Sequence, residues 1–407
     1  MKYLFIHQNF PGQFLHLLRH LVQSPANEIL FITEPTTNAI PGVRTFTYQP
    51  PTPSETTTPD AQYPEECLSR ARIVAAVADR LRALGFTPDI VIGHHGWGEL
   101  LNIHDVWPGV PLLGYFEFYY RVEGYDVGFD PEFPDVPDGP PKIRAKNTVN
   151  LLALTNPGHG QTPTVFQRDT YPAWAHPRMT LLPEGVLDTC APNPAIRATT
   201  LDIGGFQVAP TDTLVTYVAR DLEPYRGAHT MIRALPRLLR LRPDLKVVMV
   251  GGDGVSYGPR LAGRTWREHY MAEVQSVIDP ARICFPGRVP YDTFLALLQR
   301  SDAHIYLTYP FVVSWSLREA LACGCAIVGS DTAPVREFVT HRRTGLLVPF
   351  TDPKAVTAAV AELLDDPALA SRLRRNARRF AERTLRMDAY LASYEALIAR
   401  VIEGTAA

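Results

Sequence analysis

The segment that begins at Ser314 combines hydroxyl groups with a carboxylate where a helix is expected to start. Ser314 and Ser316 lie at the expected start, and apolar residues from Leu317 onward recur at helical spacing. The first turn of a helix presents free backbone N–H groups, which bind anions such as phosphate. Glu319 either accepts hydrogen bonds from a ligand or completes a capping box with Ser316. The spacing alone leaves both interpretations open.

Two arginines, Arg220 and Arg226, flank a turn in the second half of the chain. The turn follows an expected strand, Thr213 to Ala219, and precedes an apolar-periodic helix. Guanidinium groups form paired charge-assisted hydrogen bonds with phosphate, so these arginines predict a diphosphate clamp. The alternative is that both are exposed loop arginines, but their joint position beside a helix start favours the clamp.

The first half of the chain carries a second group of candidate residues. His94, His95, Trp97 and Glu99 follow an expected strand, Asp89 to Gly93. Open α/β sheets bind their ligands at the carboxyl ends of strands, so this group is expected to face a ligand. A metal site needs further ligands, and none is evident in the sequence.

Expected strands and helices alternate in both halves, which predicts two parallel sheets, each covered on both faces. A chain of 407 residues is long enough for two such domains. A Pro-containing stretch before the strand at Thr213 is expected to be an irregular linker. We therefore expect an N-terminal domain over 1–190, a linker over 191–211, a C-terminal domain over 212–385, and a helix over 386–407 that packs back towards the N-terminal domain.

An acidic and aromatic tract runs from Gly124 to Pro141. Tyr125, Phe129 and Phe133 need burial, so the tract is expected to be an ordered excursion rather than a flexible linker. A helix is expected to follow it, from Lys142 to Leu154.

The motifs of the second half resemble those of retaining glycosyltransferases of family 4, which have the GT-B fold. The family's nucleotide-sugar motif contains two glutamates that precede Ala-x-Ala-x-Gly. Glu319-Ala-Leu-Ala-Cys-Gly324 is similar to the part of this motif that begins at the second glutamate. Residues 220–227 are similar to the family's Gly-Arg-Leu-x-x-Glu-Lys-Gly loop, with Arg226 in place of lysine. The resemblance implies an α/β protein of two doubly wound Rossmann-like domains that face each other across a cleft.

The motifs and the resemblance together suggest roles for individual residues, although the family often carries a histidine where Glu117 falls, so the role of Glu117 is not inherited from the family. The catalytic candidates are Arg220, Arg226, Glu117 and His95. The donor-binding candidates are Gly12, Gly252, Asp253, Arg288, Val289, Phe311, Ser314, Trp315, Ser316, Leu317 and Glu319. The acceptor-side candidates are Phe10, Trp97, Glu99, Tyr119 and Tyr120. No metal and no cofactor is expected beyond the nucleotide-diphosphate sugar that serves as donor substrate.

The chain departs from the family at Phe311, where the first glutamate of the motif would fall. A phenylalanine cannot accept a hydrogen bond from a sugar hydroxyl. Either a carboxylate of the first half, Glu117 or Glu99, supplies the missing acceptor, or the donor sugar presents an apolar edge, as a deoxy sugar does. We favour the carboxylate.

The expected activity is the transfer of a sugar from a nucleotide-diphosphate sugar to an acceptor hydroxyl, with retention at the anomeric carbon. Synthesis of a cell-envelope polysaccharide, glycolipid or glycoconjugate is the expected setting, with a sugar, a lipid-linked or another hydroxyl acceptor. Two alternatives remain open: a non-catalytic nucleotide-sugar-binding homologue and a GT-B sugar-nucleotide epimerase.

Composition narrows the class of protein further. The formal charge of −2 and the pI near 6.6 argue against a nucleic-acid-binding protein. Five cysteines without metal-ligand spacing are expected to be reduced. No apolar run approaches the roughly 20 residues of a membrane helix, so a cytoplasmic protein is expected. The arginines between 372 and 379 are expected to form a solvated helix face, with a peripheral contact at the inner membrane face as the alternative.

Overall fold

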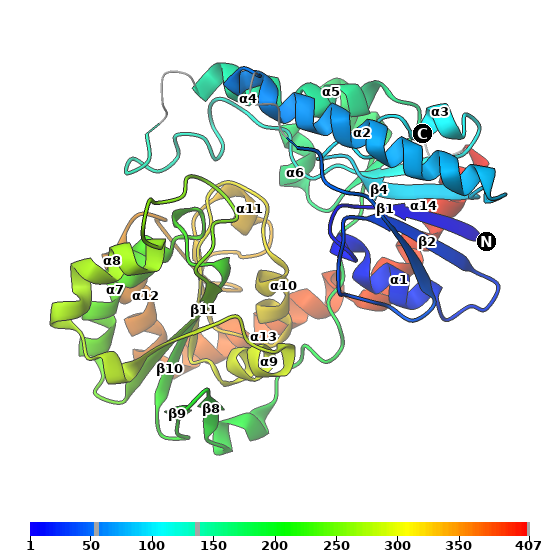
Figure 1. Ribbon diagram of the computed structural model, residues 1–407. Coiled ribbons are helices and arrows are strands. Elements are labelled where there is room, and N and C mark those ends of the chain that lie inside the picture. Colours follow the sequence, from blue (N-terminus) through cyan, green and yellow to red (C-terminus); the bar gives the residue numbers. More distant parts are fainter. Residues whose placement is uncertain (53–56, 135–138, 405–407) are drawn as a thin grey trace. The chain divides into compact units, whose positions relative to one another are not determined.

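The computed structural model describes residues 1–52, 57–134 and 139–404. The chain forms two compact units (Figure 1). Unit 1 comprises Met1–Gly128, Phe133–Glu184 and Asp388–Ala407. Unit 2 comprises Phe129–Glu132 and Gly185–Met387.

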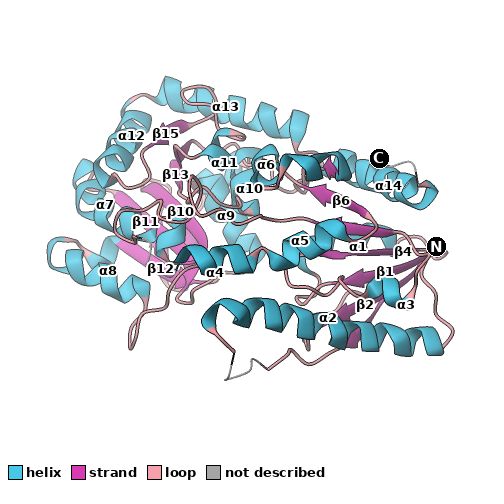
Figure 2. Ribbon diagram, turned by 90° about the horizontal axis from the view of Figure 1, so that it is seen from above, coloured by secondary structure: helices cyan, strands magenta, loops and turns pink. Residues whose placement is uncertain are grey.

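In the described part of unit 1, seven parallel strands form one sheet. Their order is β3 (Val43–Thr47), β2 (Glu28–Thr33), β1 (Lys2–Ile6), β4 (Ile90–His94), β5 (Leu112–Tyr115), β6 (His159–Thr162) and β7 (Met179–Leu181). The central strands are near-continuous apolar runs because both faces of a parallel sheet are buried. Figures 1 and 2 show α2 on one face and α1 and α14 on the other.

The helices of unit 1 connect these strands. They are α1 (Leu15–Leu21), α2 (Pro59–Ala83), α3 (Ile103–Val106), α4 (Gly139–Lys146), α5 (Thr148–Thr155), α6 (Val165–Thr170) and α14 (Met387–Glu403). The single helix expected from Lys142 to Leu154 is interrupted at Asn147. The Asn147 side chain binds the backbone of Tyr120 through both its oxygen (2.9 Å) and its nitrogen (2.6 Å). These bonds fix Asn147 between the two helices.

Unit 2 contains a six-stranded parallel sheet within its described residues. The order is β12 (Ile283–Gly287), β11 (Leu245–Gly252), β10 (Thr213–Asp221), β13 (Ala303–Tyr306), β14 (Ile327–Ser330) and β15 (Leu346–Val348). Its helices are α7 (Ala228–Leu241), α8 (Trp266–Val274), α9 (Tyr291–Arg300), α10 (Trp315–Ala322), α11 (Ala333–Arg336), α12 (Pro353–Asp365) and α13 (Pro367–Thr384). The expected fold class, two Rossmann-like α/β domains, is confirmed.

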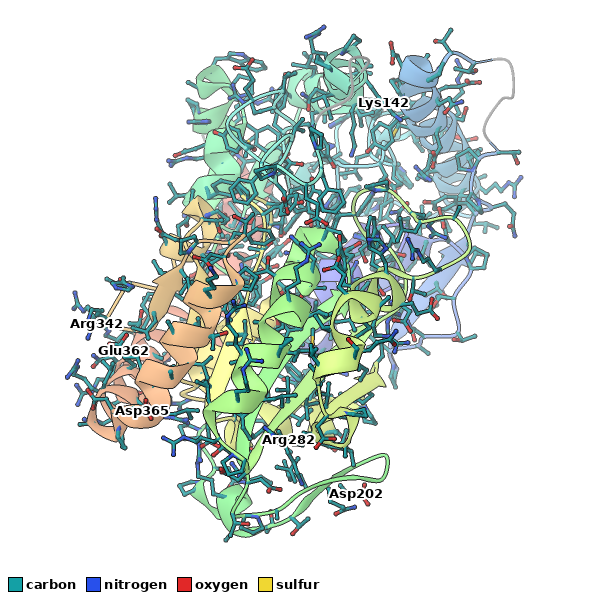
Figure 3. The ribbon with its side chains drawn as sticks, turned by 90° about the vertical axis from the view of Figure 1, so that its left-hand side faces the viewer. Lys142, Asp202, Arg282, Arg342, Glu362 and Asp365 are labelled. Atoms are coloured by element: carbon teal, nitrogen blue, oxygen red, sulfur yellow. The ribbon has the colours of Figure 1, made fainter. Side chains whose placement is uncertain are left out.

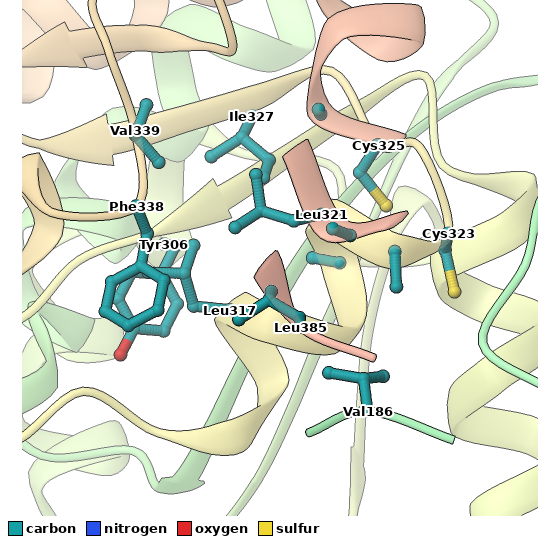
Figure 4. Packing of buried hydrophobic residues seen from close by; sticks show 14 of the residues in the cluster. Val186, Tyr306, Leu317, Leu321, Cys323, Cys325, Ile327, Phe338, Val339 and Leu385 are labelled. Carbon is teal, nitrogen blue, oxygen red and sulfur yellow. The ribbon is translucent and has the colours of Figure 1, made fainter. Parts of the chain in front are cut away.

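A hydrophobic cluster fixes α10 against the sheet of unit 2 (Figure 4). Leu317 and Leu321 of α10 are fully buried together with Ile327 of β14 and with Leu385, which follows α13. Burial of a leucine side chain contributes about 1.5–3 kcal/mol, so this packing holds the first turn of α10 in place at the end of β13.

The stretch before β10 is structured rather than irregular. It contains a 3-10 helix, Pro194–Ala198, and a two-stranded antiparallel sheet of β8 (Leu201–Ile203) and β9 (Phe206–Val208). Ile203 and Val208 are buried in a cluster with residues of β10 and β11. These contacts make residues 194–208 part of unit 2.

The basic helix face expected between 372 and 379 is only partly solvated. Arg378 donates to the carbonyl oxygens of Cys190 and Ala322, both at 2.9 Å. Arg374 donates to the carbonyl oxygens of Ser301 and Asp302 at 3.0 and 2.7 Å. These two arginines therefore tie α13 to neighbouring backbone. No helix in the described ranges is both long and apolar enough to cross a membrane.

Part of the excursion expected between Gly124 and Pro141 belongs to unit 2, while residues 135–138 lie outside the described residues. The ring of Phe129 contacts Phe350 at a centroid distance of 5.5 Å. Asp130 accepts a hydrogen bond from the hydroxyl of Tyr309 (3.1 Å) and lies 2.9 Å from Nε2 of His229. Both members of this Asp130–His229 pair are only 2% exposed. The segment Phe129–Glu132 is therefore anchored by buried contacts of Phe129 and Asp130.

Candidate functional site

Arg226 is held at the carboxyl end of the unit 2 sheet. It ends a 3-10 helix, Pro224–Arg226, between β10 and α7, and is 7% exposed. Its Nη1 donates to Thr308 Oγ1 and to the Val312 carbonyl oxygen, both at 2.8 Å. Both acceptors lie between β13 and α10, so the guanidinium is fixed near the first turn of α10.

Gly227 permits this arrangement. Its φ is +73°, and a Cβ there would lie 2.5 Å from the side chain of Leu307. A larger residue would be strained and would push the loop away from β13. The glycine therefore lets the Arg226 loop lie directly over the end of β13.

Arg220 behaves differently from Arg226. Its side chain is exposed and makes no hydrogen bond or ion pair with the residues that the structure describes. Of the two arginines of the expected clamp, Arg226 is thus held by hydrogen bonds, whereas Arg220 is exposed. No hydrogen bond among the described residues connects the two side chains.

The first turn of α10 begins two residues earlier than the capping-box spacing suggests. Ser314 is the N-cap residue, and no side chain caps the helix. The Ser314 hydroxyl lies 2.7 Å from that of Ser316, and the Ser314 backbone N–H donates to the Tyr306 hydroxyl at 2.8 Å. A capping box between Ser316 and Glu319 is therefore not formed.

Glu319 instead accepts a hydrogen bond from the hydroxyl of Tyr291 at 2.8 Å. Tyr291 is the first residue of α9, and its hydroxyl also lies 3.1 Å from Cys190 Sγ. Burial raises the pKa of Glu319, and the Tyr291 hydrogen bond opposes this rise. Trp315 and Ser316 of the same turn are half-buried, whereas Leu317 lies in the core.

Phe311 lies within an aromatic cluster rather than on an open surface. It is 3% exposed, and its ring lies 4.9 Å from the ring of Tyr257 and 5.5 Å from that of Tyr225. Tyr225 in turn stacks on Tyr309 at 4.4 Å. A carboxylate at position 311 would be desolvated by these rings, so the cluster accounts for the phenylalanine.

The glycine-rich turn after β11 lies against two carboxylates that the sequence analysis did not single out. Cβ atoms at Gly252 and Gly254 would lie 2.6 and 3.0 Å from Asp221 Oδ1. Glu223 accepts hydrogen bonds from the backbone N–H groups of Ser256 (2.8 Å) and Tyr257 (3.0 Å). Burial raises the pKa of Glu223 to about 7. Both carboxylates could have been identified from the sequence, because they lie between Arg220 and Arg226 in the same loop.

The remaining donor candidates of unit 2 have partners of their own. Asp253 forms two hydrogen bonds with Arg267, at 2.7 and 2.6 Å. Arg288 lies 3.3 Å from Asp221 with a largely exposed side chain. Val289 packs against the cluster around β10 and β11. Of these three, Arg288 has the most exposed side chain, and Asp253 is exposed as well.

In unit 1, His94 rather than His95 contacts the expected carboxylate. His94 Nε2 lies 3.7 Å from Glu117 Oε2, and His94 Nδ1 accepts the Gly96 N–H at 2.8 Å. The imidazole stacks against Trp97 at 4.2 Å. The nitrogen that faces Glu117 therefore carries the proton when the ring is neutral. Gln13 Nε2 donates to the other oxygen of Glu117 at 3.4 Å.

His95 points into the interior of unit 1. It is 3% exposed, its ring lies 4.5 Å from Phe116, and a Cβ at Gly114 would lie 2.2 Å from it. Burial lowers the pKa of His95 to about 3, so the ring is neutral at ordinary pH. The structure does not bring His95 together with Glu117.

His7 completes the group around His94, and the sequence analysis missed it although it directly follows β1. Its ring lies 5.3 Å from that of His94 and 5.1 Å from that of Trp97. Burial, with His94 nearby, lowers the pKa of His7 well below its usual value. Gly12, at φ +56°, is needed here because its Cβ would lie 2.9 Å from the His7 ring.

The acceptor-side candidates divide into buried and accessible residues. Glu99 is fully buried, accepts hydrogen bonds from the Gln8 N–H (3.1 Å) and the Tyr48 hydroxyl (3.3 Å), and has a pKa raised by burial. Phe10 is 4% exposed. Trp97, Tyr119 and Tyr120 are half-buried, and Lys146 Nζ lies 3.7 Å from the ring centre of Tyr120. Among the described residues, no group of three or more potential ligands is placed to hold a metal ion.

Family models match most of the chain. Residues 25–190 match the model "Glycosyl transferase family 4 group", and residues 204–380 match "Glycosyl transferases group 1". A glycogen synthase of Mycobacterium tuberculosis is 33% identical over 162 residues, covering 40% of this chain and 36% of that protein. A GDP-mannose-dependent phosphatidylinositol monomannoside mannosyltransferase of Mycolicibacterium smegmatis is 31% identical over 195 residues, covering 47% and 48%. The chain thus spans less than half the length of these relatives.

Solved structures resemble the whole chain at low sequence identity. Sucrose-phosphate synthase from Thermosynechococcus elongatus has a TM-score of 0.76 at 17% identity, covering 99% of this chain and 100% of the other. Anabaena HepE in complex with UDP and glucose has a TM-score of 0.69 at 16% identity, covering 98% and 99%. This likeness concerns the fold. Two glycosyl transferase models together match most of the chain, which belongs to the family 4 glycosyl transferases of the GT-B fold.

Proposed function

We propose that the protein transfers a sugar from a nucleoside-diphosphate sugar to an acceptor hydroxyl, with retention of the anomeric configuration. The observation that carries this proposal is the position of Arg226. It is a buried, fixed cation beside the uncapped first turn of α10, and the two together suit a diphosphate.

In this reaction the bond between the anomeric carbon and the diphosphate breaks, and a bond to the acceptor oxygen forms on the same face. The acceptor proton passes to an oxygen of the leaving diphosphate. Arg226 and the N–H groups of α10 stabilise the charge that develops on the leaving group, because they are oriented before the reaction begins. Arg220, whose guanidinium is free, adds a second cation when the diphosphate is bound.

We assign the nucleoside to the carboxylate of Glu319, which accepts hydrogen bonds from the ribose hydroxyls. Tyr291 already orients this carboxylate at 2.8 Å. Arg288 and Val289 lie in the turn that we assign to the base, and Gly252 lies where backbone can approach the nucleotide. We assign the sugar and the acceptor to the group of His94, Glu117 and Trp97 in unit 1, with Tyr119 and Tyr120 on the acceptor side.

A panel of nucleoside diphosphates and nucleotide sugars tests the proposal. Ligands that bind the native state raise its melting temperature, so at least one diphosphate is expected to stabilise the protein. The corresponding nucleotide sugar should then release that diphosphate when acceptors are added. Absence of stabilisation by every nucleoside diphosphate would contradict the proposed site. The names of the relatives suggest glucosyl and mannosyl donors for the first panel.

A second candidate function rests on Phe311. Its ring replaces a carboxylate that would hold the donor sugar, and it is buried among tyrosines. A protein with this site could bind a nucleotide sugar without transferring it. Such a protein would be stabilised by the donor but would release no diphosphate with any acceptor, whereas an enzyme would release it. We propose a cytoplasmic setting and a polysaccharide, glycolipid or glycoconjugate product, with peripheral membrane contact left to experiment.

A further inference from the structure

A cavity of about 350 Å³ lies at the amino end of the unit 2 sheet, away from the residues discussed so far. It is formed by the 3-10 helix Pro194–Ala198, the start of β13, the end of α12 and the first turns of α13. Its lining residues are Arg197, Asp302, Leu363, Leu364, Pro367, Ala370, Ser371 and Arg374. The lining thus contains two cations, one carboxylate and one hydroxyl beside the apolar side chains of Leu363, Leu364, Pro367 and Ala370.

Positive charge exceeds negative charge around this cavity. Arg197 Nη1 lies 2.6 Å from Asp302 Oδ1, and Arg300 Nη1 lies 3.0 Å from Asp302 Oδ2. Arg374 donates to the carbonyl oxygen of Asp302 and not to its carboxylate. Arg300 is buried and does not line the cavity, so the lining, with Arg197, Arg374 and Asp302 as its charged residues, carries one net positive charge. Burial and the neighbouring Arg197 lower the pKa of Arg374, as expected where cations lack a counterion.

The acidic residues nearby on α12 are paired with other arginines. Glu362 lies 2.6 Å from Arg342, and Asp365 lies 2.8 Å from Arg242. Figure 3 shows Glu362, Asp365 and Arg342 together on one side of the molecule. These pairs do not neutralise the cavity.

The two lining arginines retain hydrogen-bond donors for a ligand. Arg374 bonds to the protein only through Nη2, and Arg197 only through Nη1 and Nη2. Nε and Nη1 of Arg374 and Nε of Arg197 therefore have no acceptor among the described residues. The hydroxyl of Ser371, which is exposed, lies on the same wall.

We propose that this cavity binds the phosphate group of a small phosphate monoester, with Arg197 and Arg374 as its cationic ligands. Arginine donors match the oxygens of a phosphate, and the net positive charge of the lining favours an anion. Leu363, Leu364 and Pro367 offer an apolar wall to the organic part of the ligand. The inference is independent of the function proposed above.

This site is distinct from the diphosphate site. Asp302 precedes β13, whereas Thr308, which binds Arg226, follows the same strand. Six residues of extended chain separate them, which corresponds to roughly 20 Å. A bound phosphate would instead tie the segment around Arg197 to α13, because each supplies one arginine.

Titration calorimetry of the full-length protein at constant ionic strength tests the proposal, with glucose 1-phosphate and orthophosphate as separate probes. Both are expected to bind, and glucose 1-phosphate is expected to bind more tightly because it also covers the apolar wall. Tighter or equal binding of orthophosphate would overturn the assignment to a monoester. Absence of binding by both would overturn the site.

Three variants locate the binding. Arg374→Gln is expected to weaken the binding of glucose 1-phosphate at least tenfold. Ser371→Glu places a carboxylate in the cavity, so it is expected to abolish binding and to raise the melting temperature of the free protein. Because Ser371 makes no bond on which the fold depends, this second variant remains informative if Arg374→Gln fails to fold. Arg375→Gln, an exposed neighbour on α13, is the matched control and should bind as the parent does.

Arg226→Gln separates the two sites. If it abolishes glucose 1-phosphate binding while Ser371→Glu leaves it unchanged, the ligand occupies the diphosphate site and the cavity is not a binding site. If Ser371→Glu alone abolishes it, the cavity is confirmed, whatever the outcome for nucleotide-sugar binding.

Discussion

At the scale of single residues, Arg226 and Arg220 show two ways of presenting a cation to a phosphate. Arg226 is buried and its guanidinium is fixed by Thr308 and the Val312 carbonyl. Arg220 is exposed and free among the described residues. The guanidinium of Arg226 is therefore oriented before a phosphate binds. Arg220 can add positive charge, but its long side chain must be ordered when the phosphate binds, which costs conformational entropy.

We therefore expect Arg226→Gln to weaken nucleoside diphosphate binding by roughly 1.5–3 kcal/mol, the range for hydrogen bonds to charged groups. It should also lower the melting temperature, because buried acceptors lose their donor. Arg220→Ala should weaken binding without changing stability. Calorimetry with a nucleoside diphosphate and thermal unfolding of the free protein measure the two effects. Unchanged diphosphate affinity in both variants would contradict the proposed diphosphate clamp.

For Glu319 the structure permits a sharper prediction than its spacing did. Since no capping box is formed, Glu319→Gln should not lower the melting temperature of the free protein. A lost cap would cost about 0.5–2 kcal/mol. The variant should instead bind ribonucleoside diphosphates more weakly, and it should lose the preference for a ribonucleotide over its 2′-deoxy form. A destabilised variant with unchanged nucleotide affinity would assign Glu319 to the helix rather than to the ligand.

Glu223 should make stability depend on pH. Its pKa is raised by burial from 4.5 to about 7, so the folded state binds its proton more tightly than the unfolded state does. The associated stability is fully present below about pH 4.5 and is lost as the pH rises through about 7. The parent should therefore lose stability relative to Glu223→Gln over this interval, by up to a few kcal/mol. Denaturant unfolding of both proteins at pH 5 and pH 8 measures this, and a constant difference would contradict it.

At the scale of elements, the alternation of strands and helices was sufficient to predict both parallel sheets. Each central strand is a short apolar run. Such runs indicate buried parallel strands when helical segments separate them. Strand β6 was missed because His159-Gly-Gln-Thr162 has no such run, and its burial comes from its neighbours in the sheet. The segment 191–211 was expected to be an irregular linker because of its prolines, but packing of Ile203 and Val208 orders it.

His95 was the expected catalytic histidine, but His94 is the one that contacts Glu117. This difference has a simple geometric reason. Successive side chains of a strand point to opposite faces, and β4 extends through His94. One of two adjacent histidines must therefore point towards the site and the other into the packed interior. The sequence predicts that a histidine lies at this strand end, but not which of the two faces Glu117.

Of the two carboxylates of unit 1 that we propose as substitutes for the glutamate absent at Phe311, Glu117 is the more accessible. Its side chain is 26% exposed, whereas Glu99 is fully buried and bound to Gln8 and Tyr48. We expect Glu117→Gln to lower kcat strongly and to leave diphosphate affinity unchanged, since Glu117 is assigned to the sugar alone. Glu99→Gln should reduce stability rather than act on transfer.

Steady-state kinetics and diphosphate calorimetry on the two variants separate these effects. If both turn over at the parental rate, the ring of Phe311 selects the sugar by shape. Donors that lack a hydroxyl at that edge should then be the better substrates.

At the scale of the whole molecule, the anchoring of Phe129–Glu132 in unit 2 depends on one buried pair. Asp130→Ala leaves the imidazole of His229 and the hydroxyl of Tyr309 in the interior without this carboxylate, so we expect a loss of about 1–3 kcal/mol. The control is Glu132→Gln, which breaks a partly exposed pair with Arg233 and should cost about 1 kcal/mol or less. Thermal unfolding of the full chain measures both, and equal losses would contradict the buried pair.

The division into units has a consequence for biosynthesis. The chain passes from one unit to the other four times, after Gly128, Glu132, Glu184 and Met387. On the ribosome, residues 129–132 emerge long before the rest of the unit to which they belong. Unit 1 in turn lacks α14 until nearly the entire chain has been made. Domains that consist of one continuous segment can fold in sequence as they leave the ribosome, but here both units are completed late. Nascent chains shorter than about 387 residues should therefore be the forms that chaperones and proteases encounter.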